Sequence, residues 1–134
     1  MDAPLSALRL PALVIGGFGI FTTLGSWPPV ALPTWMLVDA LAWPPSGLDA
    51  FATAESRLAL AILGGVLLGW GVTLWSLSRG VAIPRAALHG MLAWFCLDSL
   101  GSVLAGAAAN VLPNIAFLAL LVGPILLASR RQTA

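Results

Sequence analysis

Few residues of this chain could do chemistry, and they stand in apolar surroundings. Asp98 is the one carboxylate inside a long apolar run, His89 precedes it by nine residues, and Cys96 is the single cysteine. Arg57 stands at the start of another apolar run. A charged group inside an apolar helix is costly and is therefore a functional hypothesis by default. Asp98 and Arg57 are accordingly the residues for which a chemical role is weighed.

The spacing of these residues argues against several kinds of site. Nine residues turn a helix by about 900°, so His89 and Asp98 point in opposite directions and form no dyad. A single histidine cannot supply both axial ligands of a haem, and a single cysteine excludes an internal disulfide or a CxxC pair. Cys96 has no cationic neighbour on its face, which predicts a buried, unreactive thiol. The sequence predicts no metal site and assigns no catalytic residue.

The composition indicates lipid rather than water as the surroundings of the chain. Of its 134 residues 60% are apolar and 8% are charged, and its mean hydropathy is +1.00. A soluble domain carries about 25% charged residues, so a globular enzyme, a nucleic-acid binder and a disordered tail are all excluded. Six arginines against five acids give a net charge of +1 and no basic patch for nucleic acid. We expect one all-α, polytopic transmembrane domain over residues 1–134.

Four apolar stretches are long enough for a bilayer, which needs about 20 residues per helix. The clearest is 58–78, which holds no charge, and the others are 8–24, 86–109 and 112–129. They predict a bundle of four transmembrane helices, with a long loop at 25–57 between the first two.

A cleaved signal peptide is the alternative for the first stretch. Asp2 and the lone Arg9 make a weak basic flank, and no A-x-A site follows the apolar run. We therefore interpret this stretch as a span.

The arginines indicate the orientation of the spans. In a four-span zigzag, Arg57 lies on one side and the other five lie opposite: Arg9, Arg79, Arg85, Arg130 and Arg131. The positive-inside rule places the side with five arginines in the cytoplasm. We expect a multi-pass protein of the bacterial cytoplasmic (inner) membrane with both termini cytoplasmic, and the loop 25–57 and the turn near Asn110 outside.

The outer loop carries Trp-Pro-Pro twice, at 27–29 and 43–45, around the apolar segment 33–43. Thr34 can cap a short helix here, and the second Pro-Pro must end it. About ten residues make only about 15 Å of helix, so this helix should lie in the outer interface rather than cross. Two interpretations stay open: an aromatic anchor at headgroup depth, or a lid or partner-contact surface. The tryptophans concerned are Trp27, Trp35 and Trp43.

Small residues mark the helix faces that we expect to pack. One stripe on the helix 58–78 continues from Arg57 through Ala61, Gly64, Leu68, Gly71 and Trp75. Gly65 and Gly69 lie one step around that helix. A stripe on the helix 86–109 holds Trp94, Asp98, Gly101, Ser102, Ala105 and Ala109. Small residues allow close helix approach, so these faces should pack together.

If they do, Arg57 and Asp98 could meet in the outer half of the bilayer. A structural ion pair, a protonated Asp98 bonded to a carbonyl, and a role in proton or ligand handling all stay open.

The segment Glu55-Ser56-Arg57-Leu58, followed by Gly64-Gly65, Gly69 and Gly71, resembles the small four-helix bacterial membrane proteins grouped as DoxX-like. The motif covers residues 55–71, and the four-span plan covers most of the chain. The family is named for members associated with quinone-linked oxidation of sulfur compounds. The resemblance implies a small membrane subunit beside redox partners. The paired cysteines that would establish such chemistry are absent, so no catalytic residue is carried over.

Three functions follow as expectations. The first is an accessory or assembly subunit of a larger membrane complex, redox-linked in respiration or photosynthesis, with lipids and other integral membrane subunits as partners and no enzymatic activity of its own. The second is a small membrane enzyme or a quinone- or lipid-binding protein with a pocket near Arg57 and Asp98. The third is a small oligomeric transporter. No cofactor is evident, and a bound quinone, lipid or pigment stays open.

Overall fold

The computed structural model describes residues 5–41, 44–45 and 47–131, and its regular structure within these residues is helical. The all-α prediction is thereby confirmed for the described part of the chain. The α-helices are α1 Arg9–Leu24, α2 Leu32–Leu41, α3 Ala54–Ser78, α4 Ile83–Leu104 and α5 Val111–Arg131. Short 3-10 helices lie at Leu5–Leu8, Pro28–Val30, Leu48–Phe51 and Ala108–Asn110.

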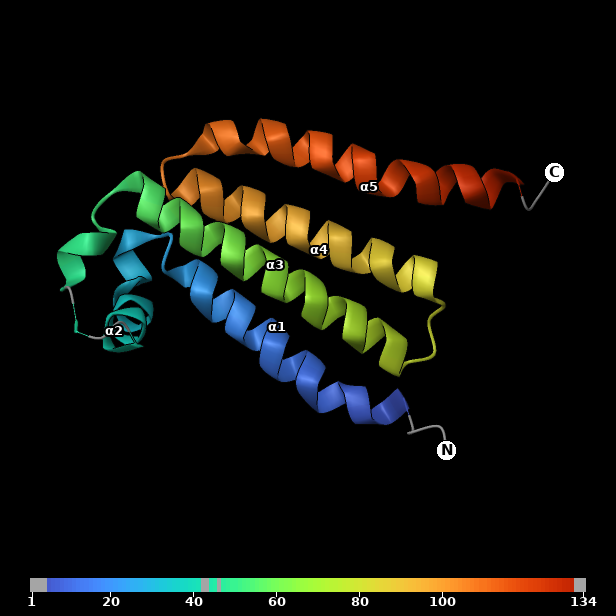
Figure 1. Cartoon of the computed structure of the whole chain (residues 1–134), viewed down its shortest axis with the longest axis horizontal. Coiled ribbons are helices and arrows are strands. Elements are labelled where there is room, and N and C mark those ends of the chain that lie inside the picture. Colours follow the sequence, from blue (N-terminus) through green and yellow to red (C-terminus); the bar gives the residue numbers. More distant parts are fainter. Residues whose placement is uncertain (1–4, 42–43, 46, 132–134) are drawn as a thin grey trace.

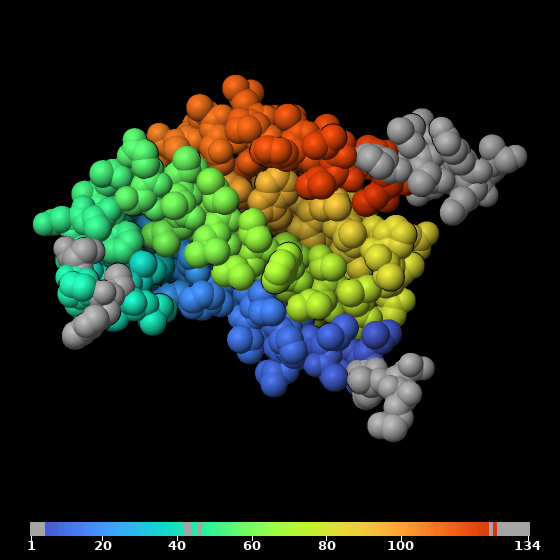
Figure 2. Space-filling model, in the orientation of Figure 1, coloured from blue at the N-terminus to red at the C-terminus, as the bar shows by residue number. Residues whose placement is uncertain are grey.

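The long helices lie side by side in the order α1, α3, α4, α5 (Figure 1). α3 packs along both α1 and α4, α1 also touches α4, and α5 packs on α4. Figure 2 shows α1 (blue) and α5 (orange to red) on opposite edges of this layer. Within the described residues α5 does not pack back onto α1. The four predicted long helices are thus arranged as an open layer, in which α1, α3 and α4 form the core and α5 lies at the edge.

The two ends of the layer differ. The start of α1, the α3–α4 turn and the end of α5 lie at one end, which carries Arg9, Arg79 and Arg85 and is called the arginine end (Figure 1). α2 and the α4–α5 turn lie at the opposite end, called the cap end. In Figure 1 α2 is seen nearly end-on, so it runs across the direction of the long helices.

The largest differences from the predicted spans are at the start of α3 and at the end of α4. α3 begins at Ala54 rather than at 58, because the Thr53 hydroxyl accepts a hydrogen bond from Ser56 N at 3.2 Å and caps the helix. α4 ends at Leu104 rather than at 109. Gly106 has a φ of +84°, and Ala107 N donates to Ser102 O at 2.8 Å, which together form a glycine C-cap. Ala109 therefore lies in a 3-10 turn and not on the α4 stripe.

Burial in this layer is inverted relative to a water-soluble domain. The largest fully buried side chains are polar ones: Thr34, Asp98, Ser26 and Ser102. Large apolar side chains are exposed instead, among them Leu10 at 70%, Trp70 at 65% and Leu112 at 72%.

Three helical segments are long and apolar enough to cross a membrane: Leu5–Leu24, Ala54–Ser78 and Ile83–Leu104. The apolar segment Ala108–Gly123, which includes the start of α5, is shorter.

α3 contacts α1 and α4 through two different glycine-containing faces. A Cβ on Gly71 would lie 2.6 Å from Gly16 Cα, and one on Gly64 would clash with Thr23, so both residues face α1. The prediction that this stripe packs on α4 is therefore wrong for Gly64 and Gly71. The α4 face is the one carrying Gly65, where a Cβ would lie 2.7 Å from Asp98 Cβ.

Gly69 and Gly101 lie at the same α3–α4 contact. A Cβ on Gly69 would lie 2.9 Å from Gly90 O, and one on Gly101 would lie 2.7 Å from Ala61 Cβ. Such close backbone approach is how helices pack when small residues face each other.

Candidate functional site

A buried polar cluster surrounds Asp98, whose side chain is 1% exposed. Its Oδ2 accepts from Trp94 Nε1 at 3.1 Å, and its Oδ1 accepts from Ser102 Oγ and Asn110 Nδ2, both at 3.1 Å. Asn110 Nδ2 also donates to Ser102 Oγ at 3.0 Å. The carboxylate thus serves as a common acceptor for donors from α4 and from the turn that follows it.

The asparagines of this cluster fasten the start of α5 to α4. Asn110 reaches back twelve residues to Asp98, and Asn114 Nδ2 donates to Ser99 Oγ at 3.3 Å. Buried polar side chains need such partners, because an unsatisfied one costs about 1–3 kcal/mol. The cap-end half of the α4–α5 hairpin is therefore held by specific hydrogen bonds.

Arg57 lies at the cap end and bonds to main-chain oxygens. Its Nη1 donates to Ala52 O at 3.0 Å and its Nη2 donates to Ala105 O at 3.2 Å. Ala105 is the C-cap residue of α4. Because helix C-termini carry partial negative charge, a cation is favourable there. Arg57 Nε is buried and has no hydrogen-bond partner among the described residues.

Arg57 and Asp98 therefore bond to different partners, although both lie in the cap-end half of the core. Arg57 ties the start of α3 to the end of α4, whereas Asp98 ties α4 to the start of α5. Their positions along facing helices made an ion pair conceivable. Instead, the carbonyl of Ala105 at the end of α4 accepts from Arg57, and Asn110 in the α4–α5 turn donates to Asp98.

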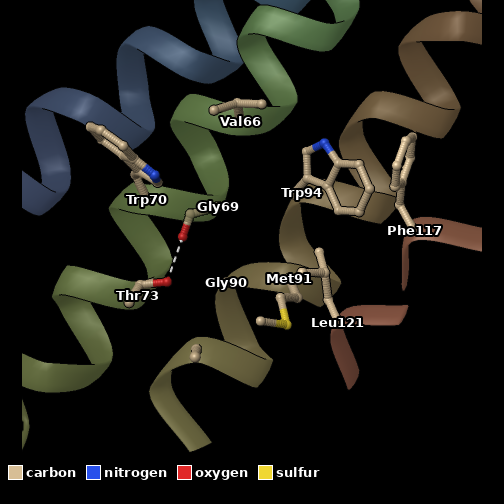
Figure 3. A pocket seen from close by; sticks show the side chains of 10 residues that line it. Val66, Gly69, Trp70, Thr73, Gly90, Met91, Trp94, Phe117 and Leu121 are labelled. Carbon is tan, nitrogen blue, oxygen red and sulfur yellow. Dashed lines mark hydrogen bonds between the residues drawn. The ribbon is translucent and has the colours of Figure 1, made fainter. Parts of the chain in front are cut away.

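An apolar groove lies between α3, α4 and α5, with a volume of about 460 Å³ (Figure 3). It is lined by Val66, Gly69, Trp70, Thr73, Ala87, Gly90, Met91, Trp94, Phe117 and Leu121. The Thr73 hydroxyl donates to Gly69 O at 2.9 Å, and the Trp94 indole N–H is bonded to Asp98. The groove therefore presents mainly carbon, and it belongs to the arginine-end half of α3 and α4.

Trp94 joins the groove to the polar cluster. Its ring lines the groove while its Nε1 bonds to Asp98, so the buried carboxylate sets the orientation of one groove wall. Figure 3 shows Trp94 from α4 and Phe117 from α5 on one side of the groove, with Trp70 from α3 on the other.

His89 and Cys96 lie outside these sites. His89 Nδ1 is 3.1 Å from Ser76 Oγ, which links α4 to α3 near the arginine end. Cys96 is exposed, so the prediction of a buried thiol is wrong. Two residues turn a helix by about 200°, and Asp98 faces α3, so Cys96 points out of the core.

The two loop tryptophans that the structure describes, Trp27 and Trp35, have different surroundings. Trp35 Nε1 donates to Gly25 O at 2.8 Å, and its ring stacks on Phe51 with centroids 5.7 Å apart. Trp27 is 43% exposed, and Trp43 lies outside the described residues. These contacts attach α2 to the cap end of the core.

Thr34 does not act as the predicted helix cap. α2 already begins at Leu32, and the Thr34 hydroxyl donates to Phe21 O at 2.8 Å instead. This bond is a second attachment of α2 to α1.

The polar cluster was only partly visible to sequence reasoning. Ser102 was placed on the face of Asp98, but Asn110 was assigned to an outer turn and Asn114 was not considered. Two asparagines four positions apart at the start of an apolar run, Asn110 and Asn114, were a usable signal, because such side chains need buried partners. The groove had no such signal, since its lining comes from three helices.

Comparison of the chain with protein-family models, curated proteins and solved structures finds no match, so the DoxX-like resemblance over residues 55–71 stays a prediction.

Proposed function

We propose that this chain is an integral membrane protein with four spans that serves as an accessory subunit of a larger, redox-linked membrane assembly. The observation that carries the proposal is the inverted burial: small and polar residues fill the core while leucine, isoleucine, phenylalanine and tryptophan side chains cover the exterior. Lipid solvates such an exterior, and small residues then provide the helix contacts. α5 supplies the fourth span, because its 21 residues extend about 31 Å, close to the thickness of a bilayer core.

The open layer favours assembly with other helices. α5 lies at one edge, and α1 lies at the opposite edge with Leu10, Leu13 and Phe18 exposed. A subunit of this shape offers two long apolar edges to neighbouring membrane helices. The resemblance to DoxX-like proteins supports a redox-linked complex as the setting.

A lipid- or quinone-binding role is the second candidate, and the apolar groove favours a lipid chain as the ligand. The pocket expected for that role lay near Arg57 and Asp98. The groove instead lies towards the arginine end and reaches Asp98 only through Trp94. The hydrogen bonds of Asp98 to the chain itself support a structural role for this residue.

The proposed orientation predicts opposite labelling of the two ends. In a Cys96→Ala background, a cysteine replacing Asp49 at the cap end should react with a membrane-impermeant maleimide in intact bacterial spheroplasts. A cysteine replacing Ala82 at the arginine end should react only after lysis. Both positions are exposed, so access depends on the membrane alone. The reverse pattern contradicts the orientation, and release of the protein by alkaline carbonate contradicts integration.

The proposed assembly predicts a defined complex larger than the 13.8 kDa chain after extraction of native membranes with a mild detergent. Blue-native electrophoresis followed by mass spectrometry should identify other integral membrane subunits with redox cofactors in the same band. Recovery of only the monomer or a self-oligomer would reject the accessory role while leaving the membrane location intact.

A further inference from the structure

We propose that the groove between α3, α4 and α5 binds one phospholipid with an anionic headgroup. One acyl chain lies in the groove, and the headgroup phosphate lies beside Arg79 and Arg85 at the arginine end. The proposal rests on the membrane location proposed above, but not on the existence of a larger complex.

The shape of the groove follows from how α5 is attached. Among the described residues, the side-chain hydrogen bonds that hold the start of α5 to α4 come from Asn110 and Asn114, both at the cap end. Towards the arginine end α5 diverges from α4 (Figure 1). Between α3 and α4 the floor is formed by Gly69 and Gly90, where the two backbones approach closely and the side chains of Thr73 and Trp94 lie against the glycines. The result is a slot between helices rather than a closed cavity.

The lining is mainly hydrocarbon. The hydroxyl of Thr73 and the indole N–H of Trp94 are already bonded within the chain, which leaves the indole N–H of Trp70 as the remaining side-chain donor among the described lining residues. The other walls include Met91, Phe117 and Leu121. A sugar, a peptide or a quinone ring placed here would leave its polar groups with few partners, which is costly in an apolar site. An acyl chain has none to satisfy, and the thioether and aromatic side chains suit contact with methylene groups.

The positive charge of the arginine end and the negative charge of the cap end favour an anionic headgroup placed at the arginine end. Arg85 stands about 3 Å nearer the arginine end than Ala87, which lines the groove, and Arg79 stands about 9 Å nearer that end than Thr73. Two residues turn a helix by about 200°, so the Arg85 side chain leaves the opposite face of α4 from Ala87 and meets the headgroup beyond the start of the helix. Both arginines are exposed, and such side chains extend several ångströms to reach the headgroup level. Guanidinium groups bind phosphate oxygens in a bidentate manner. The cap end carries the exposed carboxylates Asp49 and Glu55 instead.

The test uses the full chain purified in detergent and incubated with equal amounts of phosphatidylglycerol and phosphatidylcholine of the same acyl composition. Native mass spectrometry should detect one retained lipid per chain, with phosphatidylglycerol favoured by about tenfold because two arginines act on the anionic headgroup. The double variant Arg79→Gln/Arg85→Gln should bring the ratio close to one. Arg9→Gln removes an exposed charge at the same end from the start of α1 and should leave the ratio unchanged.

A second pair of variants tests the groove itself. Ala87→Phe places a ring in the slot and should remove the retained lipid, whereas Ala59→Phe, at an exposed position of α3 outside the lining, should not. An unaltered protein that retains both lipids equally overturns the anionic headgroup. Full retention by Ala87→Phe overturns the location, and an unchanged ratio in the double variant overturns the role of the arginines.

The unaltered protein gives a measurement that does not depend on the folding of a variant. Phosphatidylglycerol brominated on its acyl chains should quench the tryptophan fluorescence more strongly than the brominated phosphatidylcholine at equal mole fraction, because Trp70 and Trp94 line the groove. Equal quenching contradicts selective binding. If the protein is not part of a larger complex, none of these expected results changes. If the protein is not integrated in the membrane, the carbonate extraction shows this separately.

Discussion

Replacing Asp98 with alanine is expected to lower the free energy of unfolding by about 3 kcal/mol. The substitution removes the acceptor shared by Trp94 Nε1, Ser102 Oγ and Asn110 Nδ2 in a site where the carboxylate is 1% exposed. Asn110 still donates to Ser102 Oγ, but Trp94 Nε1 and the Ser102 hydroxyl lose their acceptor, and Asn110 loses one of two. Each unsatisfied buried donor costs about 1–3 kcal/mol.

Asp98→Asn separates this structural role from proton or ligand chemistry. The amide keeps one acceptor oxygen for Ser102 and Asn110, while its NH₂ group faces the N–H of Trp94, so the expected loss is about 1 kcal/mol. Asp49→Ala, at an exposed site of the cap end, should change stability by less than about 0.5 kcal/mol.

Reversible unfolding in mixed micelles, followed by circular dichroism, measures these differences. If Asp98→Ala is as stable as the unaltered protein, the cluster does not hold the α4–α5 hairpin. If Asp98→Asn abolishes an activity of the native complex at normal stability and membrane level, Asp98 takes part in chemistry.

Gly65→Ala is expected to lower the free energy of unfolding by about 2 kcal/mol. Its methyl group would lie 2.7 Å from Asp98 Cβ, 3.0 Å from Asp98 N and 3.1 Å from Asp98 Cα. Two of these atoms are backbone atoms, so α3 and α4 must separate to accept the methyl group, and overpacking of this kind costs about 1–3 kcal/mol. The separation also displaces the carboxylate from its donors.

Gly17→Ala is the matched control and should have the opposite sign. Nothing lies within 4 Å of a Cβ at this α1 position, so the higher helix propensity of alanine should stabilise the protein by up to about 1 kcal/mol. The same unfolding measurement compares the two variants. Equal effects of both substitutions would contradict a close α3–α4 contact at Gly65.

The positions of the two central helices could be predicted from the amino-acid sequence. The apolar runs around 58–78 and 86–109 predicted long helices, which α3 and α4 confirm apart from their ends. Helix formation over such runs depends on local composition and length, which a sequence contains. The ends were harder to predict, because the Thr53 cap and the Gly106 turn depend on a few hydrogen bonds rather than on hydropathy.

The sequence did not predict which neighbouring helix packs against each face. A stripe on α3 shows which residues share a face, but not which neighbour covers it, so Gly64 and Gly71 were assigned to α4 although they face α1. For the same reason the sequence suggested that Arg57 and Asp98 pair with each other. In the structure Arg57 bonds to the carbonyls of Ala52 and Ala105, whereas Asp98 bonds to Trp94 and Asn110.

The amino-acid sequence by itself determined that this protein is helical, apolar on its exterior and asymmetric in its arginines, because these properties are sums over local residues. Only the tertiary structure decided that α5 is fastened at one end and diverges at the other. That outcome depends on Asn110 and Asn114 finding acceptors on α4 near the cap end. Such contacts join residues far apart in the chain, and their free energy exists only once the helices have packed.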